Sequence, residues 1–119
     1  YNDWPLMNGR VVPGDYFGGD LWATIAHNQG AVQLHHRIGG YVLFIAALLM
    51  AWRAVRTHYL SAEAKQLALG LAAAVVLQAA LGVVTLMMVA PLGLALAHQL
   101  MAALVLALAV GFAWRVRRV

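Results

Sequence analysis

The chain has 119 residues, of which 64% are hydrophobic and 10% are charged, and it has a formal net charge of +4 and no cysteine. The missing cysteines exclude a disulfide framework. The positive charge does not indicate nucleic-acid binding, because no basic surface with interleaved aromatic residues can be traced. The high apolar content instead predicts a membrane protein.

Residues 1–30 are rich in glycine and proline, which mark turns. Trp4, Tyr16, Phe17 and Trp22 are aromatic residues of the kind found at the headgroup level of a bilayer. We therefore predict that this segment is an extracytoplasmic loop lying on the membrane surface. The chain opens without methionine and in the middle of turn-rich sequence, so we expect it to be the C-terminal part of a longer protein.

Three apolar segments follow, each with the roughly 20 residues that a helix needs to cross about 30 Å of hydrocarbon. They cover residues 31–52, 66–90 and 92–114. Strict apolar–polar alternation is absent, so a spanning β-structure is disfavoured. Asn28 and Ser61 suit N-caps of the first two helices, and Pro91 suits the first turn of the third. The predicted fold class is an all-α membrane protein with three transmembrane helices.

Six of the eight basic residues would lie on one side of a chain that crosses the membrane three times. They are Arg53, Arg56, Lys65, Arg115, Arg117 and Arg118. The positive-inside rule then predicts a cytoplasmic C-terminus, with residues 1–30 on the outside.

Two of the five histidines lie at matched depth in parallel segments. His36 is five residues into the first segment and His98 is six residues into the third, which places both roughly 8 to 9 Å below their helix starts. First and third helices of an up-down bundle can face each other diagonally. The pair is therefore a candidate set of axial heme ligands. His35 points about 100° away from His36 and cannot bind the same iron; His27 and His58 lie in loops.

The residues around His36 suit a cofactor. Gly39 and Gly40 share its helix face, where missing side chains would let a porphyrin approach the backbone. Arg37 lies near the outer interface and could pair with heme propionates. Two simpler interpretations remain open: such glycines are also common at helix packing interfaces, and a histidine in a span can merely bond a neighbouring helix.

Four motifs carry a family resemblance. They are Pro-Leu-Met-Asn-Gly-Arg at 5–10, Gln-x-x-His-Arg at 33–37, Leu-Gly-x-x-Thr-Leu at 81–86 and Ala-His-Gln at 97–99. In this order and spacing the chain resembles the C-terminal half of heme A synthase, of the mitochondrial and proteobacterial type, over nearly its whole length.

The resemblance implies that residues 31–119 are three spans of an antiparallel four-helix heme-binding bundle within an eight-span protein. The family oxidises the C8 methyl of heme O to the formyl of heme A for cytochrome oxidase. Heme b would be the cofactor here, with His36 and His98 as its iron ligands, and the substrate heme would bind in the missing N-terminal half. Two axial histidines favour electron transfer over oxygen activation. No carboxylate lies within the three segments, so catalytic residues stay unassigned and the fragment alone is expected to be inactive.

The implied partners are the missing N-terminal half, an electron donor protein and the lipid bilayer, with heme O synthase and cytochrome oxidase assembly factors as further candidates. The implied location is a bacterial cytoplasmic membrane or a mitochondrial inner membrane. Two other functions remain open: a b-type membrane cytochrome that only carries electrons, and a heme-free structural or transport subunit.

Overall fold

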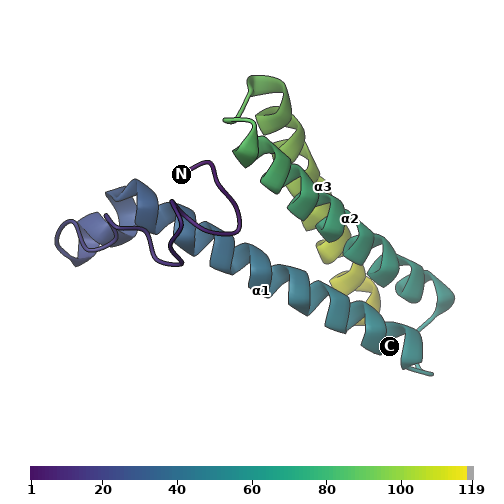
Figure 1. Cartoon of the computed structure of the whole chain (residues 1–119). Coiled ribbons are helices and arrows are strands. Elements are labelled where there is room, and N and C mark those ends of the chain that lie inside the picture. Colours follow the sequence, from purple (N-terminus) through teal and green to yellow (C-terminus); the bar gives the residue numbers. More distant parts are fainter. Residues whose placement is uncertain (118–119) are drawn as a thin grey trace.

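The computed structural model describes residues 1–117 and contains three long helices (Figure 1). These are α1 (Gln29–Arg56), α2 (Ala62–Met87) and α3 (Leu92–Val116), and a short π-helical turn, η1 (Ala23–His27), precedes them. All three long helices have the length and apolar composition needed to cross a membrane. The predicted all-α class with three helices of spanning length is confirmed. Arg118 and Val119, at the end of the predicted region 31–119, lie outside the described residues.

Side-chain caps set the starts of the first two helices. Asn28 Oδ1 accepts a hydrogen bond from the main-chain N–H of Ala31 at 2.9 Å. Ser61 Oγ accepts one from the N–H of Ala64 at 3.2 Å. Each bond satisfies a donor that the helix itself leaves unpaired, so both predicted N-caps are confirmed.

The connection from α2 to α3 is a tight turn. Val89 and Ala90 both have positive φ angles, 62° and 50°, and the Ala90 N–H bonds back to the carbonyl of Thr85 at 2.7 Å. The helix therefore ends at Met87, before the end of the apolar segment 66–90. Pro91 precedes the first helical residue of α3, where its fixed φ suits a helix start.

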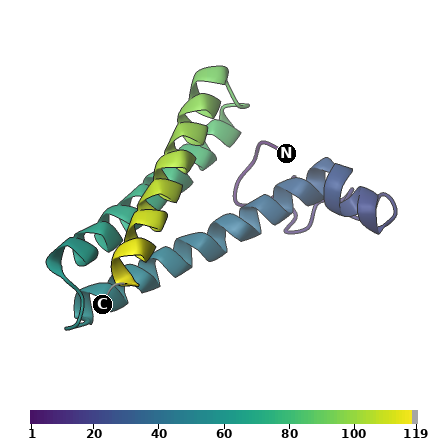
Figure 2. The same cartoon turned by 180° about the vertical axis from the view of Figure 1, so that it is seen from behind.

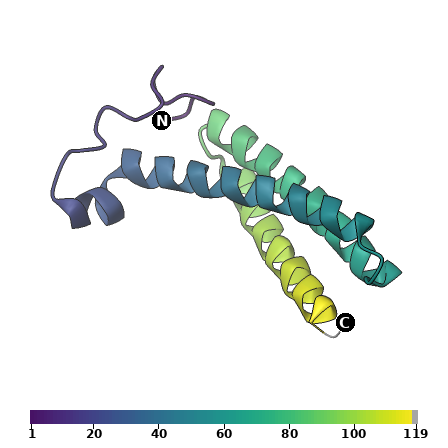
Figure 3. The ribbon, with the colours of Figure 1, turned by 90° about the horizontal axis from the view of Figure 1, so that it is seen from below.

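The helices form an open V (Figures 1 and 2). α2 packs against both α1 and α3, whereas no Cα of α1 lies within 8 Å of a Cα of α3 in residues 1–117. The shared core is buried near the middle of the helices and consists of Ala47, Leu71, Ala74, Val75 and Val105. From this crossing α1 diverges from the other two helices toward its N-terminus, as the view from below also shows (Figure 3).

Two names describe the ends of this V. The histidine end is where α1 and α3 begin and α2 ends; the arginine end is where α1 and α3 end and α2 begins. Large apolar side chains on the outer helix faces are exposed, for example Leu92 at 75% and Leu100 at 73%. Such surfaces suit lipid or further helices rather than water.

The N-terminal segment is ordered by a tight turn at Asn8-Gly9. Their φ angles are 50° and 75°, the left-handed values that a two-residue hairpin turn requires. The N–H of Met7 donates to the carbonyl of Arg10 at 2.8 Å, and the Arg10 N–H donates back at 3.2 Å. Met7 itself is buried. The motif at 5–10 is therefore a compact turn at the histidine end.

Candidate functional site

His36 and His98 face each other across the open gap between α1 and α3. Their ring centroids are 6.5 Å apart and the ring planes are nearly perpendicular, at 80°. His36 is exposed and His98 is half-buried. The structure thus brings the two predicted ligands together at the histidine end, where the main chains of their helices are too far apart to touch.

The separation of the two rings fits one metal ion between them. Metal–imidazole bonds of about 2 Å place two opposed nitrogen atoms about 4 Å apart, and each ring centre lies further out. A centroid separation of 6.5 Å is of that size. Within residues 1–117 no cluster of three or more His, Cys, Asp or Glu side chains could hold an ion. A heme iron needs only two protein donors, because the macrocycle supplies the other four, and a pair of imidazoles matches that number.

Gly82 of α2 lies against His98, and Thr85 joins the end of α2 to α3; sequence reasoning assigned neither residue to the site. A Cβ atom at Gly82 would lie 2.9 Å from His98 Cε1, so the imidazole occupies the space that a side chain would take. One turn later, Thr85 is buried and its hydroxyl bonds the carbonyls of Leu81 at 2.6 Å and of Leu94, in α3, at 3.4 Å. The signal in the sequence was the Leu-Gly-x-x-Thr-Leu motif, which carries both residues.

The remaining predicted site residues occupy different surroundings. Gly39 and Gly40 are exposed, and a Cβ at either position would meet nothing within 4 Å. Arg37 points to the N-terminal segment, where its guanidinium donates to main-chain carbonyls, including those of Asp3 at 2.9 Å and Leu6 at 3.0 Å. The glycines leave open space beside His36, and the predicted role of Arg37 toward propionates stays a prediction.

His35 lies apart from the pair. Its Nε2 is 2.9 Å from the hydroxyl of Tyr16, and the two rings meet edge to face. His27 packs edge to face on Trp22 with centroids 6.0 Å apart, and His58 is exposed in the α1–α2 connection. His35 thus contacts the N-terminal segment, and its exclusion as a second ligand of the same iron stays a prediction.

Asp15 anchors the N-terminal segment to the start of α1. Its carboxylate accepts from the Tyr1 hydroxyl at 2.5 Å and fills the space beside Gly30, and the Asn28 amide donates to its main-chain carbonyl. The Tyr1 hydrogen bond, together with the main-chain N–H of Gly30, lowers the pKa of Asp15, and the same bond raises the pKa of Tyr1. A carboxylate at a helix N-terminus is also favoured by the helix dipole.

Asp3 has a comparable role in the turn. The main-chain N–H groups of Asn8 and Gly9 and the nearby Arg37 guanidinium lower its pKa. The Gly9 N–H lies 3.4 Å from Asp3 Oδ2. Charge and hydrogen bonding therefore hold the whole segment against α1, over the histidine end.

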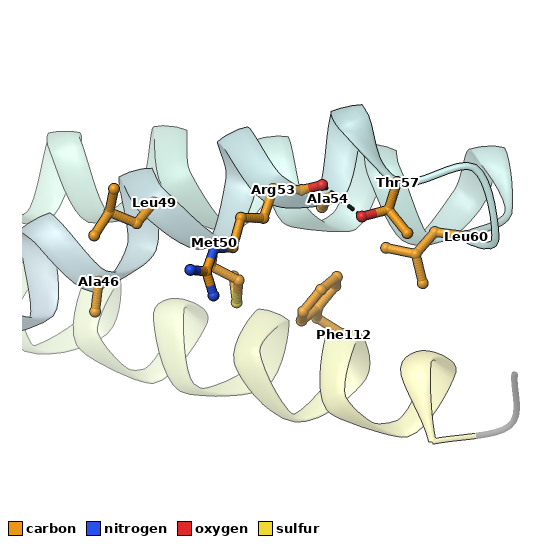
Figure 4. Close-up of a pocket in the computed structure, with 8 residues that line it drawn as sticks. All are labelled: Ala46, Leu49, Met50, Arg53, Ala54, Thr57, Leu60 and Phe112. Atoms are coloured by element: carbon orange, nitrogen blue, oxygen red, sulfur yellow. Dashed lines mark hydrogen bonds between the residues drawn. The ribbon is translucent and has the colours of Figure 1, made fainter.

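A hollow of about 400 Å³ lies at the opposite, arginine end (Figure 4). It is lined by Ala46, Leu49, Met50, Arg53, Ala54, Thr57, Leu60 and Phe112. The Arg53 guanidinium points from α1 toward α3, while the Thr57 hydroxyl donates to the Arg53 carbonyl at 2.7 Å. This hollow is remote from the histidines and is mostly apolar, so it is not the candidate site.

Comparison with known proteins gives a family match over most of the chain. The COX15-CtaA model, described as cytochrome oxidase assembly protein, matches residues 1–110. The chain is 56% identical over 118 residues to the heme A synthase of Caulobacter vibrioides and 55% identical over 118 residues to that of Caulobacter sp. (strain K31). It is 41% identical over 119 residues to the heme A synthase of Maricaulis maris.

Each of these three alignments covers 99% of this chain and 34% of the relative. The chain therefore spans about a third of the length of the curated relatives it matches. No solved structure gives a significant match.

Proposed function

Because the chain belongs to the COX15-CtaA family of cytochrome oxidase assembly proteins, we propose that it is the heme b-binding, electron-transferring part of a heme A synthase. The family match confirms the resemblance inferred from the four motifs. The relatives named heme A synthase support a role in heme A biosynthesis and imply an oxidoreductase activity for the intact protein. Three apolar helices of spanning length, in this family, indicate an integral membrane protein.

The His36–His98 pair is the observation that carries the proposal. Two imidazoles from parallel helices lie 6.5 Å apart across a gap that the helix backbones do not close. Gly39 and Gly40 add open space on the α1 side. A flat group held edge-on between α1 and α3 is the ligand shape that such a gap accommodates.

The heme iron would supply a reversible one-electron couple, and ligation by both His36 and His98 would disfavour oxygen binding. His36 and His98 would hold it, and Arg37 would orient its carboxylates. The acidic residues lie in the N-terminal segment or, for Glu63, in the first turn of α2, so none lies in the apolar interior of the three helices. We assign oxidation of the C8 methyl of heme O to the rest of the intact protein, because two histidine ligands would leave no position on this heme iron for oxygen.

In the intact protein these helices would be three spans of an antiparallel four-helix bundle within an eight-span architecture. The space between α1 and α3 at the histidine end would then be closed by a further helix and by the heme. The partners are the remainder of the same protein, which carries the substrate heme, and an electron donor protein. The membrane is the bacterial cytoplasmic membrane or its mitochondrial counterpart.

Visible spectra of the purified intact protein test the ligand assignment. His36→Ala and His98→Ala should each remove the six-coordinate low-spin signal of one heme b, because an iron that loses an axial imidazole changes spin state. His35→Ala is the matched control, since it removes the neighbouring imidazole from the same helix turn and should leave that signal intact. An unchanged heme b signal in both ligand variants would exclude the pair as ligands.

Pigment extraction from cells separates a synthase from an electron-carrying b-type cytochrome. Deletion of the intact gene should abolish heme A and leave heme O in the extracted pigment. Heme A that persists after deletion would remove the synthase assignment and leave the carrier function.

A further inference from the structure

The imidazole of His98 is seated on the backbone of α2 at Gly82. An added Cβ at position 82 would be 2.9 Å from Cε1, 3.5 Å from Nε2 and 3.6 Å from Nδ1 of His98. The edge of the ring that carries both nitrogen atoms therefore faces the glycine. Real Cβ atoms do not approach a ring carbon this closely, so this position of the ring requires glycine.

The two ring nitrogens have different surroundings. Nδ1 is fully buried and finds no hydrogen-bond partner of ordinary geometry among residues 1–117. The main chain of Gln78, one helical turn before Gly82 in α2, lies close enough to the His98 imidazole to interact with it. The side-chain Oε1 of Gln78 is also buried without a partner.

An unpaired buried polar atom is unfavourable, and a ligating imidazole usually donates its other N–H to a carbonyl or carboxylate. That second bond fixes the tautomer and leaves the opposite nitrogen free for the metal. A glycine exposes the carbonyl one turn before it, because no Cβ covers the backbone. The position of His98 against Gly82 brings the imidazole close to the main chain of Gln78. Because Nδ1 is the buried nitrogen, Nε2 is the one we assign to a ligand.

We propose that Gly82 is a positioning residue for His98: its missing side chain lets the imidazole lie against α2, with Nδ1 directed to Gln78 and Nε2 directed to the iron. This inference rests on the proposed function, in which His98 is an axial ligand. It adds a residue that would act on the heme through the position of His98.

Gly82→Ala in the intact protein tests the proposal. The atom that must move is at the far end of the His98 side chain, so the helix can remain folded while the ring is displaced. We expect heme b retention through purification to fall roughly tenfold or more, in the range seen when support for a metal ligand is removed. The low-spin electron paramagnetic resonance signal of the remaining heme should also shift, because the ring orientation has changed.

Gly70→Ala is the matched control, since it makes the same change in the same helix where a Cβ meets nothing within 4 Å. It should retain heme b and the wild-type resonance signal. If Gly82→Ala matches Gly70→Ala in both measurements, Gly82 does not position His98. A different result would contradict the proposed function itself: the heme b signal would then be unchanged in His98→Ala.

A second measurement needs no substitution at Gly82. In reduced wild-type protein with ¹⁵N-labelled histidine, the His98 Nδ1 should carry a proton that exchanges slowly with water, and Nε2 should be the coordinated nitrogen. Coordination through Nδ1, or an Nδ1 proton in free exchange, would overturn the proposal even if Gly82→Ala did not accumulate.

Discussion

Arg37 joins the N-terminal segment to the helix that carries His36. Its two terminal nitrogens lie 3.5 Å from the carbonyl of Tyr1, 2.9 Å from that of Asp3, 3.4 Å from that of Pro5 and 3.0 Å from that of Leu6. A guanidinium presents its N–H groups in a rigid planar fork, which suits several acceptors at once. Any anion that pairs with Arg37 must share it with these carbonyls.

Arg37→Lys should loosen residues 1–6 without removing the positive charge. An ammonium group on a flexible stem cannot reach four carbonyls together, and each hydrogen bond to a charged group contributes about 1.5–3 kcal/mol. Loss of one such bond raises local opening roughly tenfold. Hydrogen–deuterium exchange of the peptide that covers residues 1–10 measures this.

Arg56→Lys is the control for that experiment, because Arg56 is on the same helix and stacks on Trp52, 4.9 Å from the ring centroid. In Arg56→Lys, hydrogen–deuterium exchange over residues 1–10 should match that of the wild-type protein. Equal protection in the Arg37 and Arg56 variants would show that the guanidinium does not anchor the segment.

At the scale of the elements, the start of α1 is a junction between helix and loop. Asn28 caps the helix, and its side-chain amide donates a hydrogen bond to the main-chain carbonyl of Asp15. The carboxylate of Asp15 accepts a hydrogen bond from the Tyr1 hydroxyl. Gly30 leaves the space that this carboxylate occupies. The position of the loop is therefore coupled to the protonation of Asp15 and, through the turn at Asn8-Gly9, of Asp3.

The N-terminal segment should stay attached to the start of α1 between about pH 4 and pH 10. It should detach at lower and at higher pH. The lowered pKa values of Asp3 and Asp15 mean that their contribution is present above the unfolded pKa of about 3.9 and is lost as pH falls through the folded values. The raised pKa of Tyr1 gives the opposite sign: its contribution is present below about pH 10 and is lost as pH rises through the folded value.

A nitroxide on Asn2→Cys reports this release, since this part of the protein has no cysteine of its own. Its spectrum should sharpen below pH 4, because the label gains motion when the segment detaches. Asp15→Asn should already be more mobile at neutral pH and respond less to acid. A label whose motion is the same at pH 6 and pH 3 would contradict the coupling.

The elements themselves were predictable from the sequence, whereas their mutual orientation was not. Apolar runs of about 20 residues and the side-chain chemistry of Asn28 and Ser61 are local signals, so the helices and both caps followed from them. The approach of His36 to His98 also followed, because depth depends only on residue counts along parallel helices. The seat of His98 on Gly82 depends on how α2 is rotated about its axis, which periodicity does not specify when the helix is apolar all round.

At the scale of the whole molecule, charge is divided between the two ends of the V. Arg53, Arg56 and Lys65 lie around the α1–α2 connection, and Arg115 and Arg117 lie at the end of α3. Arg118, which belongs to the same predicted group, lies outside the described residues. Glu63 offsets part of this charge through a 2.6 Å ion pair with Arg115. The end that carries His36 and His98 holds Arg10 and Arg37 as its only arginines or lysines in residues 1–117.

This division predicts the orientation of the protein in its membrane. Short loops rich in lysine and arginine stay in the cytoplasm, so the arginine end should be cytoplasmic and the histidine end, with the N-terminal segment, should be outside. In intact cells a membrane-impermeant thiol reagent should label Asn2→Cys, while Ser61→Cys, in the α1–α2 connection, should react only after the membrane is opened. The two positions are both exposed, so the contrast reports sidedness rather than burial. The reverse pattern would place the His36–His98 pair on the cytoplasmic side and would contradict the predicted orientation.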